Sequence, residues 1–156
     1  RAAPAARGNA RRRLATVAGY SGTPLPRKLG IGPGARVGLV RAPDGFDATL
    51  GELPLGVAPR PVGAGKTPFD VIVCFAARLA DLARDLPRLR DRLDPAGGLW
   101  IAWPKKSSGV ATDVTEAGVR GRGLAAGLVD NKVCAIDDTW SGLRFVVRVE
   151  NRPKKK

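Results

Sequence analysis

The sequence predicts a single α/β domain with an open, mostly parallel β-sheet and one antiparallel strand at its C-terminal end. Short β-branched runs, such as VIVCF at residues 71–75, alternate with segments of helical period, which is the order of parallel strands joined by crossover helices. The last two apolar runs are separated by only a short turn, as in an antiparallel hairpin. A chain of 156 residues is long enough for one hydrophobic core.

The first part of the domain carries weak structural signals. Residues 18–34 are dense in Gly and Pro and should wrap the edge of the domain, with one helical turn over residues 24–29. The first strand is the apolar run ARVGLV at residues 35–40. A turn then leads to a short helix over residues 46–53, and an edge strand interrupted by two prolines is expected near residues 57–62.

The strongest signals lie in the middle of the chain. The run at residues 71–75 is typical of a strand that is buried on both faces of a parallel sheet. A long amphipathic helix follows it, which Pro87 should kink or locally break. The apolar stripe of this helix consists of leucines at three- and four-residue spacing, namely Leu79, Leu82, Leu86, Leu89 and Leu93.

The last third of the chain should complete the sheet. A turn over residues 94–98 leads to a second buried strand, LWIAW at residues 99–103. The helix expected over residues 113–126 opens with the Asp-x-x-Glu spacing of a capping box. Residues 132–136 and 143–149 then form the two strands of the closing hairpin.

The net charge of +13 is concentrated in the two tails. Of the 27 basic residues, nine lie before residue 14 or after residue 151, and all 14 acidic residues lie between, which leaves a net charge of +4 for residues 14–151. We therefore expect polyanion binding through the tails. The residues expected to make these contacts are Arg1, Arg7, Arg11, Arg12, Arg13, Arg152, Lys154, Lys155 and Lys156.

The composition argues against several chemistries. The chain has no histidine and only two cysteines, so zinc sites and His-dependent nucleophilic catalysis of the usual kinds are not expected. Cys74 and Cys134 each lie inside an apolar run and are interpreted as reduced core residues. We expect no cofactor, no metal and no membrane span. The expected location is cytoplasmic, or an organelle matrix if the N-terminal arm is the remnant of a targeting peptide.

Two glycine-rich segments are reminiscent of phosphate-binding motifs. The GAGKT loop at residues 63–67 lacks the first glycine of a P-loop, because Arg60 stands there, and it leads into a strand through Pro68 instead of opening a helix. The glycines at residues 30–34 precede their strand, whereas a dinucleotide fingerprint follows one. Both segments are interpreted as loops.

In an open α/β sheet, ligands bind outside the carboxyl ends of the strands. The predicted topology brings to that edge cations and indoles that could hold a phosphate and stack a base or a sugar. Alternatively, Lys105 pairs with Asp137 or Asp138 while the tryptophans pack the edge; in a catalytic interpretation, one of these aspartates is a base beside Lys105. No catalytic residue is assigned. The candidate ligand-binding residues are Arg41, Asp44, Arg78, Trp103, Lys105, Lys106, Ser107, Asp137, Asp138 and Trp140.

The second half of the chain resembles that of a class I methyltransferase. The shared features are a central strand that opens with Phe69-Asp70, a helix, the turn Leu-x-Pro-x-Gly-Gly at residues 93–98, a strand that ends in proline, a helix and two final strands. The resemblance implies a Rossmann-like sheet of the methyltransferase type. The first half departs from the pattern, because Arg41 and Pro43 stand where the family has the glycines that admit S-adenosylmethionine, and no clear acidic residue ends a second strand to hold the ribose.

A further resemblance covers residues 18–149. The strings AGYSGTPLPRKLGI (18–31), WPKKSSGVATDVTE (103–116) and GLVDNKVCAIDDTWSGLRFVVR (127–148) are similar to an uncharacterised bacterial family, the domain-of-unknown-function family number three thousand and fifty-two. Membership would imply a methyltransferase-like fold and no assigned activity.

Together these features favour a non-catalytic binding or structural protein. Its degenerate methyltransferase-like body, residues 18–150, would dock to a larger assembly. The disordered basic arm at residues 1–17 and the basic tail at residues 151–156 would contact RNA in a ribonucleoprotein particle, so the expected partners are RNA and a protein of that assembly. The alternative is an enzyme or sensor that binds a small phosphorylated or nucleotide-like ligand at the carboxyl ends of the strands.

Overall fold

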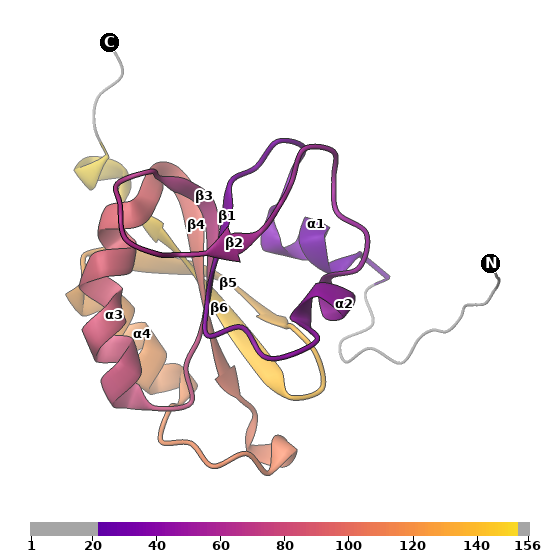
Figure 1. Cartoon of the computed structure of the whole chain (residues 1–156). Coiled ribbons are helices and arrows are strands. Elements are labelled where there is room, and N and C mark those ends of the chain that lie inside the picture. The colour runs from indigo at the N-terminus through magenta and orange to yellow at the C-terminus, as the bar shows by residue number, and fades with distance from the viewer. Residues whose placement is uncertain (1–21, 153–156) are drawn as a thin grey trace, which may run out of the picture.

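The computed structural model describes residues 22–152, which form one six-stranded sheet with helices on both faces (Figure 1). The strand order is β2-β1-β3-β4-β6-β5, and β6 runs antiparallel to both of its neighbours while the other pairs are parallel. The predicted α/β fold class is confirmed. The strands are β1 Val37–Val40, β2 Arg60–Pro61, β3 Phe69–Phe75, β4 Leu93–Pro104, β5 Leu128–Ala135 and β6 Trp140–Val147.

Four α-helices and two 3₁₀ turns accompany the strands in the described residues 22–152. They are α1 Leu25–Leu29, α2 Phe46–Leu50, α3 Leu79–Arg92, α4 Glu116–Ala125, η2 Lys106–Ser108 and η3 Val149–Asn151. Helices α3 and α4 cover one face of the sheet, and α1 and α2 cover the other (Figure 1). No helix of this part of the chain is long and apolar enough to cross a membrane.

The continuous apolar run of β3 is explained by its two buried faces. Ile72 and Cys74 pack into the core beneath α3 and α4, while Val71, Val73 and Phe75 pack into the core beneath α1 and α2. Side chains of a strand alternate between faces, so a strand buried on both sides needs apolar residues at every position. The central place of this strand, predicted from its sequence, is confirmed.

The arrangement of β1 creates a topological switch point. Strand β1 pairs in parallel with β2 on one side and with β3 on the other. The connection that leaves the carboxyl end of β1 leads to β2 on one side, whereas the connection that leaves β3 leads to β4 on the other, so a crevice is expected outside the carboxyl ends of β1 and β3. Ligands of open α/β sheets bind at such points.

Helix α3 is not broken at Pro87, contrary to one of the two outcomes that the sequence predicts. The helix runs from Leu79 to Arg92 with Pro87 inside it. Pro87 is exposed, whereas Leu82 and Leu89 are fully buried against the sheet. The packing of the leucine stripe offsets the missing backbone hydrogen bond, which by itself costs about 3 kcal/mol in a helix interior.

The predicted capping box of α4 is not formed. Thr115 is the N-cap of α4, and its side chain accepts a hydrogen bond from Gly118 N at 3.0 Å. Asp113 Oδ1 instead accepts from Leu79 N at 2.7 Å, the first amide of α3. Asp113 therefore ties the loop that follows β4 to the start of α3.

The predicted turn at residues 94–98 is a bulge inside β4. Phe69 pairs with Leu93, and Val71 pairs with Gly98, so the four residues 94–97 of β4 lie opposite the single residue Asp70 of β3. A Cβ atom at Gly97 would come within 2.5 Å of Asp70 O, so the close approach of the two backbones requires glycine there.

Candidate functional site

The antiparallel pairing of β4 and β6 builds the carboxyl edge of β4. The register places Pro104 opposite Trp140, so Lys105 meets the turn that precedes β6. Lys105 N donates to Thr139 O at 2.8 Å, and Lys105 Nζ donates to Asp137 O at 2.8 Å. The predicted contact between Lys105 and the aspartate pair therefore exists, but it is made to a backbone carbonyl and to neither carboxylate.

The two aspartates of this turn have different roles. Asp137 Oδ1 accepts hydrogen bonds from Thr139 N and Trp140 N, both at 2.8 Å, and so holds the turn. These two hydrogen bonds occupy Oδ1 with contacts inside the turn. Asp138 is exposed and, within residues 22–152, makes no hydrogen bond or ion pair. Asp138 is thus the carboxylate of the pair that is available to a ligand.

The two tryptophans of the predicted site lie in different surroundings. The Trp140 ring is half-buried and packs edge-to-face on Phe75, with 5.0 Å between ring centroids, and Phe75 packs likewise on Phe46 at 4.9 Å. Trp103 is only 7% exposed and belongs to the core beneath α3 and α4. Trp103 therefore offers little surface to a ligand, whereas Trp140 lies at that edge.

Three further polar residues predicted for the site are exposed at the same edge. Lys106 and Ser107 lie in η2, directly after β4, and Arg78 lies directly before α3. Thr112 Oγ1 donates to Ala77 O at 2.6 Å, so the loop that begins with η2 returns to the residues beside Arg78. In the described part of the chain, the side chains of Lys106 and Arg78 form no ion pair. We call Arg78, Lys106, Ser107, Asp138 and Trp140 the rim residues.

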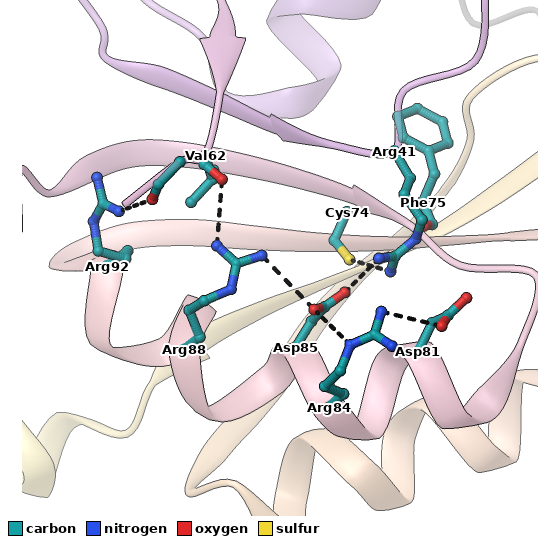
Figure 2. A network of polar contacts seen from close by, with 10 residues as sticks. Arg41, Val62, Cys74, Phe75, Asp81, Arg84, Asp85, Arg88 and Arg92 are labelled. Carbon is teal, nitrogen blue, oxygen red and sulfur yellow. Dashed lines mark hydrogen bonds and ion pairs between the residues drawn. The ribbon is translucent and has the colours of Figure 1, made fainter. Parts of the chain in front are cut away.

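Arg41 does not join the rim residues. It has a φ of +53°, and its side chain crosses the switch point toward α3 (Figure 2). Nε donates to Phe75 O at 2.9 Å, Nη2 contacts Cys74 Sγ at 3.7 Å, and Nη1 lies 2.6 Å from Asp85 Oδ2. All three guanidinium nitrogens therefore contact protein atoms across the crevice. Asp44, the remaining predicted residue, is exposed in the turn between β1 and α2.

Asp85 is the centre of a cluster that sequence reasoning missed. Its side chain is 7% exposed, and the guanidinium groups of Arg84 and Arg88 each lie 3.7 Å from Oδ1 (Figure 2). The spacing to Arg88 on one helix face was visible in the sequence. The contact with Arg41, which is 44 positions earlier, follows only from the pairing of β1 with β3.

Neither cysteine is a nucleophile at neutral pH. Burial raises the pKa of the Cys74 thiol to about 12, and burial also raises the pKa of Cys134, which is half-buried. Since the thiolate is the reactive form, both thiols are inert. Among residues 22–152, no group of three or more Cys, Asp or Glu side chains is arranged to hold a metal ion.

The predicted polyanion-binding residues lie almost entirely outside the described residues. Only Arg152 is described, and its Nε donates to Val147 O at 3.1 Å. The other eight are Arg1, Arg7, Arg11, Arg12, Arg13, Lys154, Lys155 and Lys156.

The fold is that of class I methyltransferases. An S-adenosylmethionine-dependent methyltransferase from Aquifex aeolicus is similar over 78% of this chain and 87% of its own, with a TM-score of 0.56 and 16% identity. Fibrillarin from Aeropyrum pernix, with S-adenosylmethionine bound, is similar over 80% of this chain and 69% of its own, with a TM-score of 0.50 and 15% identity. Magnesium protoporphyrin IX methyltransferase from Synechocystis, also with S-adenosylmethionine bound, is similar over 74% of this chain and 71% of its own, with a TM-score of 0.50 and 12% identity.

No protein-family model and no curated protein matches the chain. The methyltransferase-like resemblance found in the sequence is confirmed by the fold, whereas the numbered family of unknown function stays a prediction. At these identities the similarity establishes the fold and leaves the activity to be proposed.

The expectation of a non-catalytic binding or structural protein is corrected by these comparisons. Several of the solved structures that share the fold are S-adenosylmethionine-dependent methyltransferases, and some hold the cofactor. The sequence argument treated the loss of the glycine loop as a loss of catalysis. The loss of one cofactor contact does not remove the carboxyl edge at which enzymes of open α/β sheets act.

The residues of this chain do not fit S-adenosylmethionine in the crevice between β1 and β3. Arg41 stands where the backbone would approach the cofactor, and its guanidinium spans the crevice to Asp85. A fixed guanidinium would also oppose the positive sulfonium of the cofactor. Strand β2 has two residues and leads into Val62, so no carboxylate ends it to bind a ribose. We derive no chemical step through this cofactor.

Proposed function

We propose that the protein is an enzyme that acts on a small phosphorylated or nucleotide-like molecule at the carboxyl edge of the sheet. The observation that carries the proposal is the set of rim residues that follow β3 and β4 or precede and begin β6 at this edge, whose polar side chains pair with no residue from 22 to 152. The class I methyltransferase fold supports it, because ligands of open α/β sheets bind at this edge. The strings at residues 18–31, 103–116 and 127–148 further support membership of the uncharacterised bacterial family number three thousand and fifty-two.

Each rim residue has a distinct part in the proposal. Lys106 and Arg78 supply cations for the phosphate, and the half-buried indole of Trp140 offers a ring on which a base can stack. Asp138 is the unpaired carboxylate that accepts a proton from a hydroxyl or amine of the bound molecule. Lys105 and Asp137 position the turn through their backbone contacts and do not touch the ligand.

Binding is tested with adenosine 5′-monophosphate and the full chain, with the indole N–H signal of Trp140 in NMR spectra as the readout. We expect saturable binding that shifts this signal. Lys106→Ala should weaken binding about tenfold, since one charge-assisted contact is lost. Arg122→Ala is the matched control, because it removes an equal charge from an exposed position on α4. Equal losses in the two variants, or no saturable binding, would contradict the site.

Turnover is tested by incubating the chain with a mixture of nucleoside phosphates and detecting products by mass spectrometry. The wild type should convert at least one of them. Asp138→Asn should lower the rate by about a hundredfold or more while binding persists, because the amide cannot accept the proton. Binding without conversion of any member of the mixture would contradict the proposal that the protein is an enzyme. RNA or protein partners stay predictions that these measurements do not address.

A further inference from the structure

The GAGKT loop is held against α3 by two arginines. Arg92, which is 8% exposed, donates from Nε to Thr67 O at 3.0 Å and from Nη1 to Gly63 O at 2.6 Å. Arg88 donates from Nη1 to Val62 O at 3.3 Å. Figure 2 shows both side chains directed from the helix toward the chain at Val62. The arginines thus fix carbonyl groups at both ends of the loop.

These contacts leave the amide donors of the loop unused. Within residues 22–152, the backbone N–H groups of Gly63, Ala64, Gly65 and Lys66 donate to no protein acceptor. Gly65 has a φ of +120°, which L side chains rarely adopt, so the loop path depends on glycine. Successive unpaired amides in such a turn are donors for an anion.

The loop and the C-terminal half of α3 line a cavity of about 630 Å³ that is open to solvent. Cations outnumber acids in its lining, and Arg60 stands beside it, 5.5 Å from the centroid of the same Phe69 ring over which Arg92 lies. The cavity therefore has a positive potential that favours anions. Its lining residues are Gly63, Ala64, Gly65, Lys66, Arg88, Asp91 and Arg92.

We propose that this cavity binds the phosphate group of a small phosphorylated molecule. Lys66 and Arg88 supply the charge, and the loop amides supply directed hydrogen bonds. The loop is not a P-loop, because it leads into β3 and opens no helix.

The site is separate from the rim residues and does not depend on the proposed function. Phe69 begins β3 and Arg92 ends α3, so the cavity lies toward the amino ends of the central strands. The rim residues lie at the carboxyl ends.

Calorimetry and NMR spectroscopy on the full chain test the proposal, with ribose 5-phosphate and inorganic phosphate as probes. Ribose 5-phosphate should bind with saturation and shift the amide signals of residues 63–66. Lys66→Ala should weaken binding about tenfold. Lys66 is exposed, and its side chain makes no hydrogen bond or ion pair with any residue from 22 to 152, so the variant should fold normally. Asp91→Asn should strengthen binding several-fold, because it removes the one carboxylate of the lining.

Arg90→Ala is the matched control, since Arg90 is an exposed cation of α3 that does not line the cavity. It should change the affinity less than twofold. Equal losses in Lys66→Ala and Arg90→Ala would mean that only the net charge matters and would overturn the site. Equal affinity for inorganic phosphate and ribose 5-phosphate would overturn the small-molecule assignment in favour of free phosphate. Shifts confined to the signals of the rim residues would also reject this cavity.

Discussion

Replacing Asp85 with alanine should lower the free energy of unfolding by about 3 kcal/mol. The Asp85 carboxylate is 7% exposed, and among the described residues its Oδ2 atom accepts no aligned hydrogen bond, so the ion pair with Arg41 compensates its burial. Removing the carboxylate leaves the Arg41 guanidinium beside Cys74 without its counter-charge, while Arg84 and Arg88 lose theirs. Urea denaturation followed by circular dichroism measures the change.

Asp81→Ala is the control for the Asp85 variant. Asp81 lies one turn earlier on α3 and is 24% exposed, and its one ion pair within residues 22–152 is with exposed Arg84. An exposed pair contributes about 0.5 kcal/mol or less. Similar losses in the two variants would show that the contact between Arg41 and Asp85 does not stabilise the switch point.

Replacing Trp100 with alanine should cost about 4 kcal/mol of stability. Trp100 is fully buried beneath α1 and α2, and its Nε1 donates to Leu29 O at 3.0 Å, the last carbonyl of α1. The substitution removes a large apolar group and the contact that holds α1 on the sheet. Thermal and urea denaturation measure the loss.

Trp100→Phe separates the two contributions. It keeps an aromatic ring but removes the donor to the buried Leu29 carbonyl. The lost hydrogen bond should lower the free energy of unfolding by about 1–2 kcal/mol, in addition to the loss caused by the smaller ring. A loss as large as that of the alanine variant would mean that the hydrogen bond dominates. No loss would mean that α1 is held by packing alone.

The order of the elements was predictable because their signals are local. The run at residues 71–75 and the leucine stripe of α3 identify a buried strand and an amphipathic helix without knowledge of their partners. The closing hairpin was predictable from two apolar runs joined by one turn, although β5 begins four residues earlier than expected, at Leu128. The fold class followed from this alternation.

Contacts between distant segments were not predictable in the same way. The spacing of Asp113 predicts a cap for α4, which follows it in the sequence. Asp113 instead accepts a hydrogen bond from the first amide of α3, because the loop after β4 passes the start of α3. Lys105 reaches a carbonyl and not a carboxylate, since Asp137 is committed to its own turn. Such competition among backbone amides is decided by geometry that the sequence pattern does not contain.

The position of Trp103 could have been predicted by alternation. Leu99, Ile101 and Trp103 share one face of β4, and Trp100 and Ala102 share the other. Because both faces are covered by helices, both indoles are buried, and only Trp140, at the start of β6, lies at the edge.

Calorimetric titration of the full chain with S-adenosylmethionine tests the central claim most directly, namely that the Arg41 contact with Asp85 closes the cofactor crevice and leaves the rim residues as the ligand site. The account predicts no saturable binding at cofactor concentrations up to about 1 mM, the upper end of the range in which enzymes usually bind their substrates. Saturable binding in the micromolar range, accompanied by movement of the Arg41 side chain signal, would contradict it.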